Sequence, residues 1–132
     1  MKRYKVAVAV MVINAEDEFL LVKSRRGWEF PGGFIEDEEA IKDAAIREVK
    51  EESGINIELM KFLGLEQDIE RTTCVFLFKG RPVSGKLTSS YETEDVGYYP
   101  LDEVMNMISI EHFKERIIRC LNDEEIPSII TR

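Results

Sequence analysis

Residues 28–55 read WEFPGGFIEDEEAIKDAAIREVKEESGI, a stretch that joins a loop to a helix. The Pro-Gly-Gly triplet at 31–33 breaks regular structure and permits positive φ, so we expect a loop there. From about residue 38 to residue 53 the pattern turns helical, with acidic residues at the start that suit the helix dipole. Gly54 fits a left-handed stop. The sequence therefore predicts a loop followed by a helix over residues 38–53.

The glutamates of this helix share its apolar face. At about 100° per residue, one arc of the helix contains Ile41, Ala44, Ala45, Glu48 and Glu52. The flank of this arc carries Arg47 and Glu51, and the opposite side carries Lys42, Asp43 and Lys50. A solvated or purely structural acidic helix is the alternative, but carboxylates that converge at the edge of a core take up protons or need cations. The pattern favours a site for a hard divalent cation, Mg²⁺ with Mn²⁺ as the alternative.

The rest of the chain indicates strands on both sides of this helix. Residues 4–13 and 18–23 are valine-rich and are separated by a turn-like Asn-Ala-Glu-Asp, which predicts a β-hairpin. The further expected elements are strands over 58–65, 72–79 and 96–99, a loop over 81–95, and helices over 101–107 and 110–121. This order predicts a mixed α/β domain with helices on both sides of a sheet.

Composition narrows the class of protein. A chain of 132 residues fits one domain, which we place at residues 1–132, and its longest apolar run is too short to span a bilayer. Cys74 and Cys120 lie far apart without metal-ligand spacing, so we expect reduced thiols in a cytoplasmic protein. A net charge of −8 argues against general nucleic-acid binding, although a divalent cation can still connect an acidic protein to a polyphosphate.

The spacing over residues 33–55 resembles the Nudix box of the Nudix hydrolases at every specified position: Gly33-x5-Glu39-x7-Arg47-Glu48-Val49-x-Glu51-Glu52-x-Gly54-Ile55. The segments 28–33 and 98–103 resemble the family's lead-in and its later strand-to-helix passage. The resemblance implies an α/β/α sandwich with a mixed sheet and the catalytic loop and helix on one side. It also implies metal-dependent hydrolysis of a phosphoanhydride bond.

Carried over residue by residue, the resemblance implies metal ligands on the box helix. Glu48 and Glu52 would bind the metal, Glu51 would be a further ligand or would position metal-bound water, and Gly32 would offer its backbone carbonyl. His112, the only histidine, has no cysteine ligand near it, so a surface or packing role is expected and zinc is not indicated.

Other box residues would support the chemistry. Arg47 would orient a box carboxylate, while Glu39 and Gly33 would hold the loop and helix in place. The catalytic base would be Glu51 or Glu52 in the box, or an acidic residue of a later loop. In that loop Glu92 is the first candidate, followed by Glu94 and Asp95, and the alternative is a solvated acidic loop.

The sequence indicates the residues that bind substrate less clearly than those that bind the metal. Lys23, Arg25 and Arg26 could contact phosphates, and Trp28 could offer a flat face to a base, with core packing as its alternative. The lead-in favours a MutT-like nucleoside triphosphate pyrophosphohydrolase. The alternatives are hydrolysis of an ADP-ribose-like nucleotide sugar or of an RNA 5′ end, and an inactive nucleotide-sensing module. The expected partner is a small nucleotide, and no association with a membrane is expected. Whether the chain forms a homodimer is left open.

Overall fold

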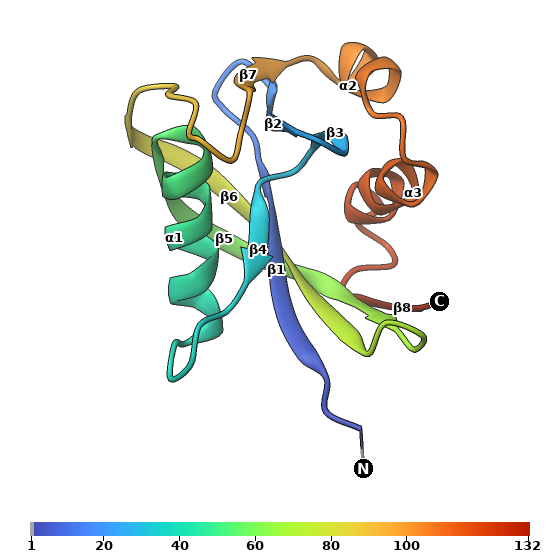
Figure 1. Cartoon of the computed structure of the whole chain (residues 1–132). Helices are drawn as coiled ribbons and strands as arrows, with labels where there is room; N and C mark the ends of the chain where they lie inside the picture. The colour runs from blue at the N-terminus through green and yellow to red at the C-terminus, as the bar shows by residue number, and fades with distance from the viewer. Residues whose placement is uncertain (1) are drawn as a thin grey trace.

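The computed structural model describes residues 2–132. In chain order its elements are β1 (Lys5–Val12), β2 (Phe19–Ser24), β3 (Gly27–Glu29), β4 (Gly32–Phe34), α1 (Ile41–Ser53), β5 (Ile55–Asp68), β6 (Thr73–Gly85), β7 (Asp95–Tyr99), α2 (Leu101–Met107), α3 (Glu111–Cys120) and β8 (Ser128–Thr131). The larger sheet has the strand order β4-β1-β6-β5-β8, and the smaller has the order β3-β2-β7. Helix α1 lies on one side of the sheets, and α2 and α3 lie on the other (Figure 1).

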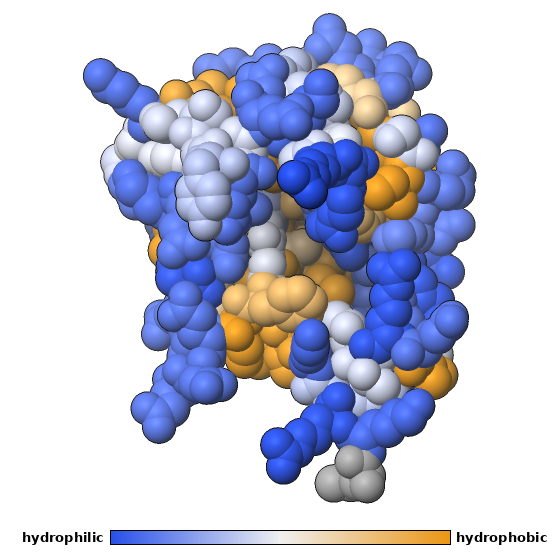
Figure 2. All heavy atoms as spheres, in the orientation of Figure 1, coloured by the Kyte–Doolittle hydropathy of each residue, from blue (hydrophilic) through white to orange (hydrophobic). Residues whose placement is uncertain are grey.

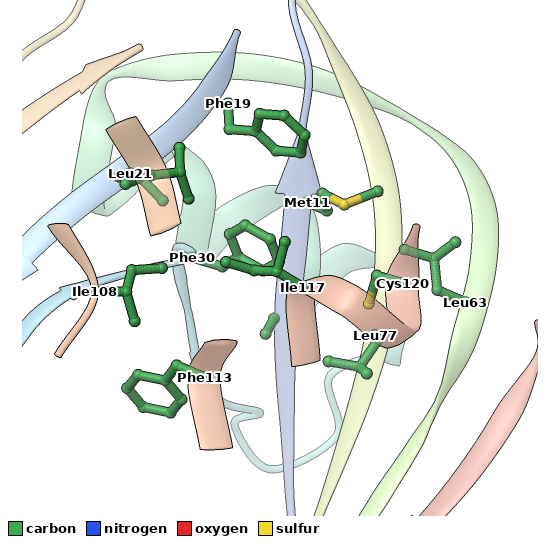
Figure 3. Packing of buried hydrophobic residues seen from close by; sticks show 12 residues of the cluster. Met11, Phe19, Leu21, Phe30, Leu63, Leu77, Ile108, Phe113, Ile117 and Cys120 are labelled. Atoms are coloured by element: carbon green, nitrogen blue, oxygen red, sulfur yellow. The ribbon is translucent and has the colours of Figure 1, made fainter. Parts of the chain in front are cut away.

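Strand β1 is buried on both faces, because alternate residues belong to two different cores. One core lies against α1 and contains Val8, Val10, Val12, Ala44, Ala45 and Val49. The other lies against α2 and α3 and contains Ala9, Met11, Leu77, Val104, Phe113 and Ile117. Figure 3 labels Met11, Leu77, Phe113 and Ile117 among the side chains of this second core. Burial on both faces explains the uninterrupted apolar run of β1. The arrangement confirms the α/β/α sandwich with a mixed sheet.

The predicted hairpin between β1 and β2 is wrong. The turn itself forms, and the Asn14 side chain accepts hydrogen bonds from the backbone N–H groups of Glu16 (3.0 Å) and Glu18 (2.9 Å). However, β1 pairs with β6 along its whole length and with β4 over residues 7–9, and β1 and β2 lie in different sheets. Strand β2 instead joins the second sheet, and a bridge between Ile13 and Phe19 connects the two.

Helix α1 begins three residues later than the sequence predicts. Glu38 has a φ of 63°, which is outside the helical region, and the first helical residue is Ile41. The intervening turn is held by the Glu39 carboxylate, which accepts the N–H of Glu36 at 3.0 Å. The predicted end is confirmed, since Gly54 has a φ of 81° and its N–H reaches back into the last turn.

Several strands differ from the sequence-based expectation. β5 and β6 extend beyond the predicted bounds, so the first part of the expected loop over 81–95 belongs to β6. Irregular register along β5 interrupts the alternation that would have revealed its length. β3, β4 and β8 are only three or four residues each and were not predicted. At Gly64 a side chain would lie 2.3 Å from the Ser128 carbonyl oxygen, so glycine permits the close approach of β8.

Neither cysteine is in a disulfide: Cys74 is half-buried and Cys120 is buried, and both are free thiols. Along residues 2–132, no helix has the length and apolar character needed to cross a membrane.

Candidate active site

Strand β4 places two glycines against the acidic face of α1. The Gly32 N–H donates a hydrogen bond to Glu52 Oε1 at 2.7 Å. A Cβ at Gly33 would lie 2.7 Å from the Glu48 carboxyl group, and a Cβ at Gly32 would lie 2.1 Å from the Val8 carbonyl oxygen. Only glycine fits at position 32, where the neighbouring atoms are backbone, and a side chain at position 33 would displace the Glu48 carboxyl group.

Arg47 connects the loop before α1 to the helix itself. Its Nε and Nη2 atoms donate to the Glu39 carboxylate at 2.7 and 2.9 Å. Its Nη1 atom donates to Glu48 at 3.0 Å and to Glu51 at 3.1 Å, and Nη2 also reaches the Phe34 carbonyl at 3.3 Å. The paired guanidinium lowers the pKa of Glu39 to about 2, and the pairing with Glu39 raises the pKa of Arg47.

The two carboxyl groups that face inward, Glu48 and Glu52, both have raised pKa values. Burial raises the pKa of Glu48, although Arg47 opposes the rise. Burial also raises the pKa of Glu52 to about 8, with repulsion from Glu48, Glu29 and Glu92 adding to it, while the Gly32 N–H opposes the rise. A divalent cation would relieve this repulsion, and carboxylate and carbonyl oxygens are the donors that Mg²⁺ prefers. The residues present therefore fit such a cation.

Glu51 lies apart from the other two box carboxylates. Its side chain is 57% exposed and is bound to Arg47. Within residues 2–132, no three carboxylate, imidazole or thiol side chains already converge as a ready-made metal site. The expected ligands are thus present as an inward pair, Glu48 and Glu52, with Glu51 on the rim. Their assignment as ligands stays a prediction.

The loop after β6 brings Glu92 to the same site. Glu92 itself is exposed, and its charge adds to the rise in the pKa of both Glu48 and Glu52. The neighbouring Thr93 is 1% exposed and donates from Oγ1 to the Glu52 carbonyl at 2.9 Å, so the loop is fastened to α1. The position is compatible with the predicted role of Glu92 as a base.

A cavity of about 220 Å³ opens beside this glycine loop. It lies between β1, β3, β4, the start of β6, the end of β5 and α3, and Gly32 and Gly33 form the part of its wall that adjoins the carboxylates. Figure 2 shows the hollow on this face, with apolar atoms in its floor. The cavity is smaller than the roughly 300–1,000 Å³ of typical ligand sites, so it suits one part of a nucleotide rather than two nucleosides.

Of the four residues predicted to contact substrate, Arg26 lines this cavity. Lys23, Arg25 and Trp28 are not among its lining residues in the described part of the chain. Trp28 packs edge-on against Tyr99 with the ring centroids 5.4 Å apart, as its core-packing alternative expects. Arg25 is exposed, and Lys23 is half-buried in β2.

Three charged residues near the site were not predicted from the sequence. The Glu29 carboxylate accepts a hydrogen bond from Arg26 Nη2 at 2.8 Å, and its charge adds to the rise in the pKa of Glu52. It stands inside the lead-in at 28–33, so the resemblance could have suggested it. Arg116 and Glu66 form a buried ion pair at 2.7 Å on the cavity wall. They are fifty residues apart, and no local pattern connects them.

The sandwich, the glycine loop and the carboxylate-bearing helix define a Nudix-type domain, which comparison with known proteins supports. The sequence model of the NUDIX domain matches residues 3–121, and the chain belongs to this family. Nudix hydrolase 2 of Arabidopsis thaliana is 26% identical over 132 residues, covering 91% of this chain and 47% of that protein. The chain therefore spans about half the length of that relative.

Two further similarities agree with this membership. A MutT-like protein of Streptomyces ambofaciens is 28% identical over 121 residues, which cover 90% of this chain and 78% of that protein. The crystal structure of a NUDIX hydrolase from Nitrosomonas europaea superposes with a TM-score of 0.84, covering 100% of this chain and 81% of that one. At 21% identity, this second similarity concerns the fold alone.

Proposed function

We propose that this chain hydrolyses a phosphoanhydride bond in a nucleoside diphosphate or triphosphate derivative, with Mg²⁺ or Mn²⁺ as its cofactor. The observation that carries the proposal is the placement of the buried Glu48 and the half-buried Glu52 on the inner face of α1, directly against Gly32 and Gly33. Two carboxyl groups that are withdrawn from water and repel each other cost stability when both are charged, and a bound cation offsets this cost. Membership of the NUDIX family supports the same conclusion.

The cation would be held by Glu48, Glu52 and the Gly32 carbonyl. When bound, it supplies charge neutralisation of the phosphate oxygens and acidifies a water molecule. Glu51 stands on the rim of the site and can complete the set or orient water. Arg47 binds both Glu39 in the loop and Glu48 on α1, so the loop and the helix are held together before substrate binds.

The remaining chemical task is to accept the proton of the attacking water. Glu92 is the first candidate, because its loop is fastened to α1 and its charge acts on both inward carboxyl groups. Glu51 and Glu52 are the candidates within the box. A base of this kind must be ionised, so the rate should fall on the acidic side of its pKa.

For the substrate, we favour a nucleoside triphosphate cleaved in the manner of a pyrophosphohydrolase. The similarity to a MutT-like protein, which covers most of both chains, agrees with this choice. The cavity beside the glycine loop has room for one nucleoside portion next to the reacting phosphates.

The test is a hydrolysis screen with Mg²⁺ on normal and oxidised nucleoside triphosphates, nucleotide sugars, dinucleoside polyphosphates and triphosphorylated RNA, with products identified by mass. Glu52→Gln should lower turnover at least about a hundredfold on the best substrate, because it removes a charged ligand at constant size. Lys50→Gln, on the exposed face of the same helix, should stay close to wild type. Equal losses in the two variants, or no hydrolysis of any substrate, would refute the proposal.

A further inference from the structure

The wall of the cavity contains two arginines around one buried carboxylate. Glu66 on β5 is 4% exposed and accepts hydrogen bonds from Arg116 Nε at 2.7 Å and Nη2 at 2.8 Å. It also accepts one from Arg132 Nη2 at 2.8 Å. Both carboxylate oxygens are therefore engaged, and the two guanidinium groups are fixed in place relative to each other.

Arg116 has a free hydrogen-bond donor. The residue is 7% exposed, and no hydrogen bond within residues 2–132 uses its Nη1 atom. In the same range no fully buried side-chain nitrogen or oxygen lacks a partner, so Nη1 is accessible to solvent, and Arg116 is one of the residues that line the cavity. The guanidinium also lies over the Phe113 ring, 4.9 Å from its centroid, which fixes the plane in which Nη1 points.

The cavity wall is positive in an otherwise acidic chain. Its charged lining residues are four arginines, Arg26, Arg71, Arg116 and Arg132, and three carboxylates, Glu29, Glu66 and Asp68. Arg26 is paired with Glu29, and Arg71 is paired with Asp68. The excess of one positive charge therefore lies at Arg116 and Arg132, which share Glu66, whereas the whole chain has a net charge of −8. Glycines 32 and 33 mark the end next to the acidic helix, and the Glu66 cluster lies on other elements, β5, α3 and the segment after β8.

We propose that Arg116 and Arg132, positioned by Glu66, bind a phosphate group other than the one at which hydrolysis occurs. The inference rests on the proposed function. The bound group is either released phosphate, as hydrolysis of a nucleoside triphosphate would supply, or a phosphate that the substrate carries away from the cleaved anhydride. Arg132 is half-buried and donates one of its nitrogens to Glu66, so other donors remain for an anion. It lies beyond residues 3–121, the part that matches the family model.

Binding of inorganic pyrophosphate to the whole chain tests this site by calorimetry in EDTA. Without a divalent cation the carboxylates of α1 repel the probe, so the arginine cluster is the attractive site. Arg132→Gln should weaken binding at least about tenfold, because it removes a charged hydrogen-bond donor. Arg132→Lys keeps the charge and should retain most of the affinity.

Arg81→Gln is the matched control. Arg81 also forms an ion pair with a glutamate, Glu58, at 2.8 Å, but it does not line the cavity. This variant should bind pyrophosphate like the wild type. No saturable binding by the wild type, unchanged affinity in Arg132→Gln, or an equal loss in Arg81→Gln would overturn the inference.

A pair of nucleotides identifies the source of the phosphate. ADP-ribose 2′-phosphate should bind at least about tenfold more tightly than ADP-ribose if the substrate itself carries the group, and Arg132→Gln should abolish the difference. Equal binding of the two, together with Arg132-dependent binding of pyrophosphate, would assign the site to free phosphate. Arg132-dependent binding without any hydrolysis would refute the proposed function alone, and hydrolysis with Arg132-independent binding would refute this inference alone.

Discussion

Replacing Glu52 with glutamine should change how the stability of the metal-free chain depends on pH. Burial raises the pKa of Glu52 from 4.5 to about 8 in the folded chain. Between these values the folded chain keeps a proton that the unfolded chain releases, so the free energy of unfolding falls as pH rises. This contribution is fully present below pH 4.5 and is lost as pH rises through about 8.

The size of the effect follows from the same shift. A gap of about 3.5 pH units, at about 1.36 kcal/mol per unit, sets an upper bound of about 5 kcal/mol. Rotation of the half-buried side chain toward water reduces the cost of ionisation, so we expect a measured difference of about 1–3 kcal/mol. Glu52→Gln has no proton to lose and should keep its stability across this range.

Urea unfolding in EDTA at about pH 5 and about pH 9 measures this difference. The control is Glu115→Gln, because Glu115 is an exposed residue of α3. Mg²⁺ added at the higher pH should restore stability to the wild type and not to Glu52→Gln. Parallel pH dependence in the wild type and Glu52→Gln would show that Glu52 is not a proton-holding group, and would refute the reasoning from burial.

Three further changes test other parts of the site. Gly33→Ala should lower turnover at least about tenfold, since the added methyl group would lie 2.7 Å from the Glu48 carboxyl; initial rates at saturating Mg²⁺ measure this. Arg47→Lys should lower turnover about ten- to hundredfold and reduce the melting temperature, because lysine cannot reproduce both bonds to Glu39; wild-type values would contradict this. Glu92→Gln should flatten the acidic limb of the pH–rate profile while the Mg²⁺ affinity changes less than about twofold, and an unchanged limb would place the base elsewhere.

Local features of the fold were predictable, whereas the choice of strand partners was not. The left-handed stop at Gly54 and the apolar run of β1 depend on neighbouring residues, and both predictions agree with the structure. The hairpin prediction failed because pairing of β1 depends on β6, which lies far along the chain. Strand β8 depends on the close approach at Gly64, which no periodicity indicates.

In the candidate site, too, the features set by local structure were predictable and those set by side-chain or tertiary contacts were not. Helical periodicity was sufficient to place Glu48 and Glu52 on the inner face of α1, because the angle between residues is fixed by the helix. The outward turn of Glu51 toward Arg47 depends on a side-chain contact, which spacing alone does not determine. The pairing of Arg116 with Glu66 depends on tertiary packing of α3 against β5, so the cavity could not be predicted from the sequence.

The parallel pairing of β1 with β6 also determines the order in which the chain can fold. Lys5 lies opposite Thr73 and Val12 lies opposite Gly80, so one edge of the first strand has no partner until that distant segment has been synthesised. β5 and β6 are antiparallel neighbours joined by a short turn, and local pairs of this kind form faster than distant parallel ones. We therefore expect the β5–β6 pair to form first and the N-terminal strand to dock onto it late. Until then its valine-rich segment is exposed, which makes nascent or refolding chains prone to aggregation at this strand.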